Sequence, residues 1–129
     1  MTKAKVLIVD DDQDVLTVLS LHFQHVGAEV TAETDPIVAK AKTLKSLKDG
    51  DPFDMLIIDI RMPHLNGFDL TRGIREAGYK GAIIAFTSTA SGEGRKTSGD
   101  AGITTYLSKQ TLNSKLALAL LEEHCPRKN

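Results

Sequence analysis

Short apolar runs that end directly at a polar residue recur along this chain. The clearest are at residues 6–9, 55–58 and 82–86. A continuous run of this length is typical of a strand that is buried on both faces, as strands are in a parallel sheet. Because other elements must cover such a strand on each side, this pattern constrains the fold more than any other feature of the sequence.

Helical patterns separate the apolar runs. We expect helices at residues 12–26, 36–47, 68–77 and 112–123, and two further strands at 28–32 and 104–107. Strands that alternate with helices and cross over right-handedly form a parallel sheet with helices on both faces. The expected fold is therefore α/β, a doubly wound, flavodoxin-like (βα)5 fold with a five-stranded parallel sheet.

The composition fits one folded domain without a basic surface. The chain has 129 residues, 41% hydrophobic and 26% charged, and a formal net charge of −1. This balance gives no support for direct nucleic-acid binding, and the single cysteine excludes an internal disulfide. The N-terminal apolar run is too short for a signal peptide or a membrane span, so we expect a cytoplasmic protein with no membrane partner. We expect one domain over residues 1–124 and a tail or the start of a linker at 125–129.

Chemically active side chains follow the strands at their carboxyl ends. Asp10 and Asp11 follow the first strand, and Asp59 follows the third. Thr87 follows the fourth strand and Lys109 follows the fifth. In doubly wound sheets the reactive site lies at this edge, so we expect these residues, which are far apart in sequence, to converge.

This set of residues has the chemistry of phosphoryl transfer to a carboxylate. Neighbouring carboxylates repel one another, and Mg²⁺, which prefers oxygen ligands, would relieve the repulsion. Lys109 and Thr87 are suited to contact phosphate oxygens. A carboxylate nucleophile, a metal ion, a lysine and a hydroxyl group can together form an aspartyl-phosphate.

The same residues lie in motifs that resemble those of response-regulator receiver domains, the phospho-acceptor modules of two-component, phosphorelay signal transduction. The motifs are Val-Asp-Asp at 9–11, Asp-Ile-Arg-Met-Pro at 59–63, Gly67, Thr-Ser at 87–88 and Tyr-Leu-Ser-Lys at 106–109. Their order, spacing and placement at strand ends all agree with the family. The resemblance extends from Lys5 to about Glu123.

The resemblance implies the acceptor and its metal ligands. Asp59 is then the phospho-acceptor of a phosphoprotein. Mg²⁺ is held by Asp10, Asp11, Asp59 and the backbone carbonyl of Arg61.

The resemblance also implies a switch and a class of partner. Thr87 and Lys109 contact the phosphoryl group, and Tyr106 turns inward when Thr87 moves toward the phosphate. The donor is a phosphohistidine on a sensor histidine kinase or a histidine phosphotransfer protein. Phosphorylation changes the surface that binds an output partner, which the sequence does not identify. The chain is then not an enzyme in the usual sense, although it assists its own phosphorylation and dephosphorylation.

The chain departs from the family pattern near the end of the sheet. Receivers usually carry proline after the conserved lysine, but here Gln110 follows Lys109. A cis bond before a non-proline residue costs about 2.5–4 kcal/mol, so we predict a trans Lys109–Gln110 bond, with Thr111 as the N-cap of the last helix. Three glycines in residues 91–99 predict a short or irregular helix over 89–100.

Several of these features have an alternative interpretation. A small hydrolase of the doubly wound class would also form an aspartyl-phosphate, but it would need an insert to hold its substrate, and the loops are short. Tyr106 could be an ordinary strand aromatic, and residues 10–12 a solvated acidic loop that caps a helix. His22 and His25 offer too few ligands for a metal site.

Overall fold

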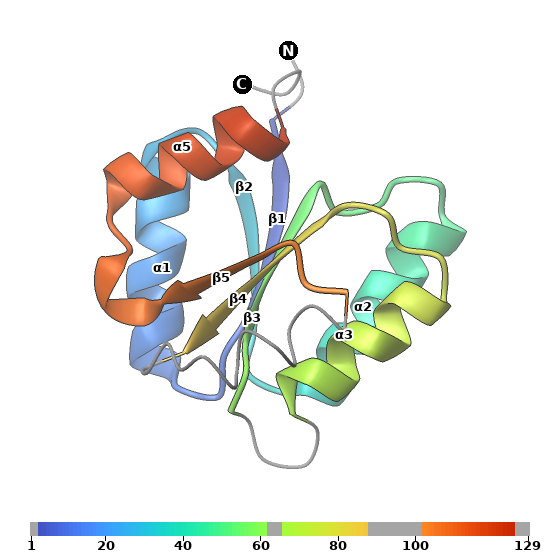
Figure 1. The fold of residues 1–129 in the computed structure, drawn as a ribbon. Coiled ribbons are helices and arrows are strands. Elements are labelled where there is room, and N and C mark those ends of the chain that lie inside the picture. The colour runs from blue at the N-terminus through green and yellow to red at the C-terminus, as the bar shows by residue number, and fades with distance from the viewer. Residues whose placement is uncertain (1–2, 62–65, 88–101, 126–129) are drawn as a thin grey trace.

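A single parallel sheet forms the centre of the protein. The computed structural model describes residues 3–61, 66–87 and 102–125. Within them, five strands lie in the order β2-β1-β3-β4-β5 (Figure 1). The strands are β1 (Lys5–Val9), β2 (Glu29–Glu33), β3 (Met55–Asp59), β4 (Ala82–Thr87) and β5 (Thr105–Ser108). Every neighbouring pair is parallel, which confirms the predicted doubly wound fold.

The helices lie close to their predicted positions. They are α1 (Gln13–His25), α2 (Pro36–Lys48), α3 (Gly67–Glu76) and α5 (Ser114–His124), with a 3-10 helix η1 (Lys109–Thr111) after β5. Apolar periodicity therefore located these helices to within two residues at each end. The irregular helix predicted over 89–100 lies outside the described residues.

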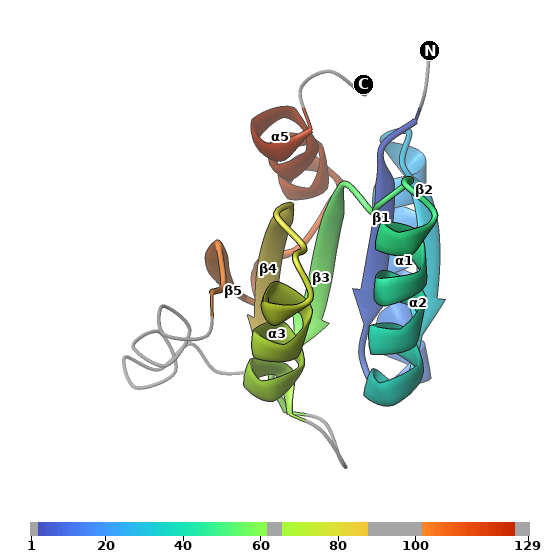
Figure 2. The ribbon, with the colours of Figure 1, turned by 90° about the vertical axis from the view of Figure 1, so that its right-hand side faces the viewer.

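Helices cover both faces of the sheet (Figure 2). On one face, Ile8 and Ile57 pack with Leu16 and Phe23 of α1 and with buried residues of α5. On the other face, alternate residues of the same strands pack against α2 and α3. Because both of their faces are buried, β1 and β3 are almost entirely apolar, as the sequence pattern indicated, whereas the edge strands β2 and β5 carry polar residues.

Polar residues cap the described α-helices at their N-termini. Asp12 accepts hydrogen bonds from the amides of Asp14 and Val15 and so begins α1 directly after β1. Asp35 caps α2 and Asn66 caps α3 in the same way. These side chains satisfy amides that have no partner inside the helix. The short connections keep the helix N-termini beside the carboxyl ends of the strands.

Of the two predictions for the segment after β5, the one about the peptide bond is confirmed and the one about the helix cap is wrong. The Lys109–Gln110 bond is trans, as predicted, since no described peptide bond is cis. Thr111, however, is not the N-cap of α5. Its hydroxyl donates to the carbonyl of Ser108 at 2.7 Å and closes η1, whereas Asn113 accepts from the Leu116 amide at 2.8 Å and caps α5. The predicted N-cap was wrong because two residues suited to capping lie close together here. Thr111 forms part of the 3-10 helix, so Asn113 caps α5.

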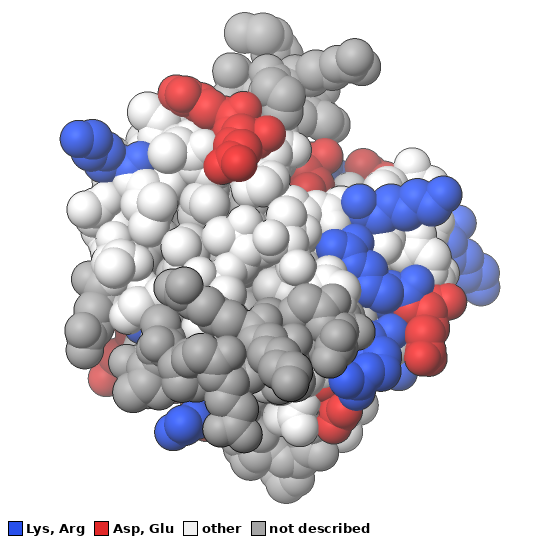
Figure 3. All heavy atoms as spheres, in the orientation of Figure 1, with Lys and Arg blue, Asp and Glu red and all other residues white. Residues whose placement is uncertain are grey.

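Lys and Arg side chains gather over α2 and α3, with acidic side chains among them (Figure 3). Some form ion pairs, such as Lys45 with Asp49 at 2.7 Å and Arg72 with Asp69 at 2.9 Å. Exposed pairs of this kind contribute little to stability. Among the described residues, no helix is both long and apolar enough to cross a bilayer.

Gly67 allows α3 to begin directly against the end of β3. A Cβ atom at this position would lie 2.5 Å from the carbonyl oxygen of Asp59 and 2.8 Å from the Cα of Ile60. The amide of Gly67 donates to the carbonyl of Ile60 at 2.9 Å. Since the clashing atoms are backbone, no side-chain movement could make room for a methyl group.

We predict that Gly67→Ala destabilises the fold by about 1–3 kcal/mol, the usual cost of overpacking. Gly73→Ala in the same helix is the matched control, because its Cβ would meet only the flexible end of Lys40, 2.9 Å from Nζ. The control should be neutral or stabilising by up to about 1 kcal/mol, owing to helix propensity. Urea unfolding measures both; equal stabilities of the two variants would contradict the prediction.

Candidate functional site

Three side chains from the ends of three strands meet at the carboxyl edge of the sheet. Asp10 directly follows β1, Asp59 is the last residue of β3, and Lys109 directly follows β5. Asp10 and Asp59 are only 1% and 4% exposed, and Lys109 is half-buried. Lys109 Nζ lies 2.8 Å from Asp10 Oδ2 and donates a hydrogen bond to Asp59 Oδ2 at 3.1 Å. One ammonium group therefore serves two buried carboxylates.

Backbone amides orient both buried carboxylates. Asp10 Oδ1 accepts from the amide of Asp12 at 2.9 Å, and Asp59 Oδ1 accepts from the amide of Arg61 at 3.1 Å. Each bond joins an aspartate to the amide two residues later, the Asx-turn pattern. One oxygen of each carboxylate is thus fixed by the backbone, and the other is presented to Lys109.

Asp10, Asp11 and Asp59 form a cluster suited to a hard cation. Each offers one carboxylate oxygen, and these oxygens all lie within 4.8 Å of one another. Asp10 Oδ2 is buried, and the contact described for it is the ion pair with Lys109 at 2.8 Å. A metal ion bound here would share this oxygen with Lys109 or replace it. Asp11 is exposed, which leaves the cluster open to solvent on that side.

The charges of this site do not balance, and the pKa of Asp59 reflects the imbalance. Burial, followed by the negative charge of Asp10, raises the pKa of Asp59 from 3.8 to about 6, against the opposing effects of Lys109 and the Arg61 amide. Burial lowers the pKa of Lys109, but its interactions with Asp10 and Asp59 outweigh burial, and the net shift is upward. Lys109 therefore stays charged while one carboxylate is held less readily as an anion.

The remaining predicted site residues lie at the same edge or on the strands that form it. The backbone of Thr87, the last residue of β4, pairs with Ser108 of β5. Tyr106 is half-buried in the middle of β5 and pairs with Ala85. The Arg61 side chain is exposed. Met62, Pro63 and Ser88 of the motifs lie outside the described residues.

Sequence reasoning missed the groups that orient the carboxylates. The amides of Asp12 and Arg61 were not predicted to do so, although an aspartate at a strand end that begins a turn is a signal for this bond. It also missed Glu33, whose backbone carbonyl accepts from the Asp10 amide at 3.2 Å. These contacts fix the strand ends that carry the site.

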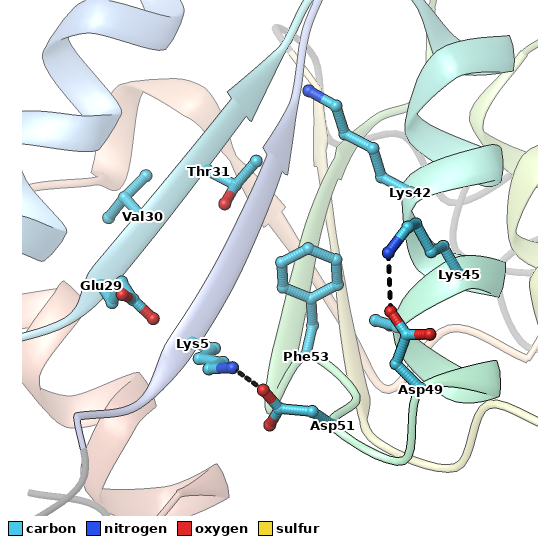
Figure 4. A pocket seen from close by; sticks show the side chains of 10 residues that line it. Lys5, Glu29, Val30, Thr31, Lys42, Lys45, Asp49, Asp51 and Phe53 are labelled. Atoms are coloured by element: carbon cyan, nitrogen blue, oxygen red, sulfur yellow. Dashed lines mark hydrogen bonds and ion pairs between the residues drawn. The ribbon is translucent and has the colours of Figure 1, made fainter.

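A hollow of about 490 Å³ lies between β2 and α2, near the amino ends of the strands and away from this cluster (Figure 4). Its lysines are already paired with carboxylates. Lys5 contacts Asp51, and Lys45 contacts Asp49 at 2.7 Å. Lys42 contacts Glu33 at 2.8 Å. Paired charges leave little to attract a charged ligand, so the cluster at the carboxyl edge is the candidate site.

We predict that Asp59→Asn stabilises the protein at pH 7 without metal, by about 1–3 kcal/mol. Because the pKa of Asp59 is raised to about 6 in the fold, the folded state binds this proton more tightly than the unfolded chain. The stability of the wild type should therefore fall as pH rises from about 4 to about 6, and the Asp59→Asn substitution should remove this loss. Denaturant unfolding across this range measures the effect. Asp69→Asn, which changes an exposed acid of α3, is the control, and its stability should follow that of the wild type across the pH range. If the stability of Asp59→Asn changed with pH as that of the wild type does, the raised pKa assigned to the buried Asp59 would be wrong.

Comparison with known proteins identifies the class. The model of the response regulator receiver domain family matches residues 6–121. The chain belongs to this family, whose members are phospho-acceptor signalling modules rather than classical enzymes. Receiver domains work with histidine kinases in two-component signalling.

Two curated relatives differ greatly in length. The chain is 38% identical over 110 residues to hybrid signal transduction histidine kinase L of Dictyostelium discoideum, covering 81% of this chain and 6% of that protein. It is 30% identical over 127 residues to an uncharacterized 14.6 kDa protein of Leptolyngbya boryana, covering 97% and 92%. The same module is thus similar to a small part of a long protein and to nearly all of a short one.

Solved structures share the fold along almost the whole chain. The chemotaxis protein CheY4 of Vibrio cholerae superposes with a TM-score of 0.82 at 29% identity, covering 95% of this chain and 99% of that one. The receiver domain of the histidine kinase CKI1 from Arabidopsis thaliana, complexed with Mg²⁺, superposes with a TM-score of 0.81 at 25% identity, covering 95% and 94%.

Proposed function

We propose that this chain is a phosphorylation-dependent switch in which Asp59 accepts a phosphoryl group from a phosphohistidine donor. The observation that carries the proposal is the buried Asp59 carboxylate, which shares the ammonium group of Lys109 with Asp10. A carboxylate nucleophile with a cation beside it can take a phosphoryl group directly, since phosphoryl transfer needs mainly positioning and charge neutralisation.

Mg²⁺ is the proposed cofactor, held by Asp10, Asp11, Asp59 and the backbone carbonyl of Arg61. The close carboxylate oxygens, two of them on buried aspartates, fit a small hard cation. The Mg²⁺ complex of the CKI1 receiver domain supports this choice. When bound, the ion would neutralise carboxylate charge and charge on the transferring group.

The protein's own residues would carry out the transfer and change conformation in response to it. An oxygen of Asp59 attacks phosphorus, the bond from phosphorus to the imidazole nitrogen of the donor breaks, and the imidazole leaves with the electron pair of that bond. Lys109, which already contacts Asp59 Oδ2, pairs with a phosphoryl oxygen, and the Thr87 hydroxyl pairs with another. Tyr106 then turns inward as Thr87 moves, which changes the surface that binds an output partner.

The proposed partner is a sensor histidine kinase or a histidine phosphotransfer protein, and the proposed location is the cytoplasm. Similarity to a hybrid histidine kinase supports this class of partner. We assign the receiver domain to residues 1–124 and a tail or the start of a linker to 125–129. A small hydrolase that forms an aspartyl-phosphate can be distinguished from a switch by experiment. The hydrolase would consume many equivalents of phosphodonor without retaining a phosphate on the protein.

We predict that acetyl phosphate with Mg²⁺ adds one phosphate to the chain, at Asp59, and that this phosphate is later lost by hydrolysis. Intact-mass spectrometry measures the gain. Asp59→Asn should not be labelled, because an amide is a poor nucleophile, whereas Asp69→Asn should be labelled like the wild type. A label that persists in Asp59→Asn would sink the assignment of the acceptor, and many-fold turnover without a retained phosphate would favour the hydrolase.

We predict that Mg²⁺ binds the unphosphorylated protein weakly and the phosphorylated protein more tightly, since phosphorylation adds negative charge at the cluster. NMR titration should show shifts at residues 10, 11 and 59. Asp11→Ala should weaken binding on the order of tenfold or more, because it removes a direct ligand, while Asp69→Ala should not. Unchanged affinity in Asp11→Ala would contradict the proposed ligand set.

A further inference from the structure

Arg75, in the last turn of α3, is half-buried and bonded to backbone carbonyls instead of carboxylates. Its Nε donates to the carbonyl of Gly102 at 3.0 Å. One terminal nitrogen donates to the carbonyls of Tyr79 and Gly81 at 3.0 and 2.8 Å. The other lies 3.4 Å from the hydroxyl of Thr104. A planar guanidinium group with donors in a fixed fork suits such a set of acceptors, whereas a lysine could not span it.

These contacts join the segments that lead into β4 and β5. Tyr79 and Gly81 precede β4, while Gly102 and Thr104 precede β5. Thr104 is also bound to β4: its amide donates to the carbonyl of Ile83 at 2.8 Å, and its hydroxyl accepts from the Ile83 amide at 3.1 Å. Arg75 therefore holds the residues that define where β5 begins relative to β4.

The position of β5 determines where Lys109 lies. β5 is an edge strand of only four residues, all half-buried, and it pairs with β4 alone. Its register runs from Ile84 opposite Thr105 to Thr87 opposite Ser108, and Lys109 follows at once. The described contacts hold this strand at two ends, through Arg75 before it and through the ion pairs of Lys109 after it.

We propose that Arg75 is a positioning residue for Lys109, acting through β5. By fixing the start of the strand, it sets the distance of the Lys109 ammonium from Asp59 and from a phosphoryl group on Asp59. The inference rests on the proposed function of Asp59 and Lys109, and it adds to that function a residue at the opposite edge of the sheet. A small displacement of a group that contacts the reacting atoms can slow a transfer severely.

The test compares the rate of labelling by acetyl phosphate in the wild type, in Arg75→Ala and in Arg72→Ala. Arg72 lies one turn earlier on α3, is exposed and pairs only with Asp69 among the described residues, so its loss removes an arginine without touching β5. Arg75→Ala should label on the order of tenfold more slowly, and Arg72→Ala at the wild-type rate. Equal rates for Arg75→Ala and the wild type would overturn the inference.

A double-mutant cycle separates positioning from general destabilisation. If Arg75 acts through Lys109, adding Arg75→Ala to Lys109→Ala should slow labelling no further. Equal fold-losses in both backgrounds would contradict the inference. Free guanidinium, far below concentrations that unfold the protein, should restore the rate of Arg75→Ala by filling the same carbonyl site, whereas sodium chloride should not. Should Arg75→Ala fail to fold, Arg75→Lys, which keeps the charge and the stem but lacks the fork, takes its place in the labelling, double-mutant and exchange measurements.

A measurement that is independent of phosphorylation distinguishes a failure of this inference from a failure of the proposed function. Amide hydrogen exchange at residues 105–109 should be faster in Arg75→Ala than in Arg72→Ala, because the start of β5 is released. Unchanged exchange overturns the inference even if labelling succeeds. A wild type that acetyl phosphate does not label refutes the proposed function instead, and faster exchange in Arg75→Ala would then still establish that this residue positions β5.

Discussion

The burial of two carboxylates against one ammonium group is the constraint on which this structure depends. Asp10 and Asp59 lie almost wholly out of water, and Lys109 is the cation within hydrogen-bonding distance of both among the described residues. The strand order explains why the cation has a long side chain. β4 lies between β3 and β5, so the side chains of Lys109 and Asp59 must together bridge two strand spacings, about 10 Å. A buried group of net negative charge is costly unless a proton, a cation or new hydrogen bonds relieve it.

The net negative charge of the buried carboxylates accounts for the chemistry of the site, but it does not account for the stability of the fold. The raised pKa of Asp59 and the close approach of three carboxylates are both signs of a site that a cation would stabilise. The apolar core on the two faces of the sheet supplies the stability that makes such a site tolerable. The unbalanced charge is thus confined to one edge of an otherwise regular fold.

Helix α3 runs between the carboxyl ends of the strands and their amino ends. At its N-terminus, Gly67 brings the helix backbone against the residue that carries the Asp59 carboxylate. At its C-terminus, Arg75 holds the segments that begin β4 and β5. Gly67 and Arg75 lie outside the site itself. Both nevertheless bear on the positions of Asp59 and Lys109.

The sequence by itself determined the strands, the helices and the residues that meet at the carboxyl edge. Apolar runs bounded by aspartate, threonine and lysine are local signals, and the rule for parallel sheets converts them into a common edge. The local signal failed at the start of α5, where Thr111 and Asn113 are both good caps and only the 3-10 turn after β5 selects between them.

Only the tertiary structure decided the electrostatics and the supports of the site. The pKa of Asp59 depends on burial and on a charge from another strand, neither of which is encoded in neighbouring residues. Arg75 has the sequence signature of an ordinary exposed helix arginine. Its partners are backbone carbonyls in loops, and every residue carries a carbonyl, so no residue pattern could have marked them before the chain was folded.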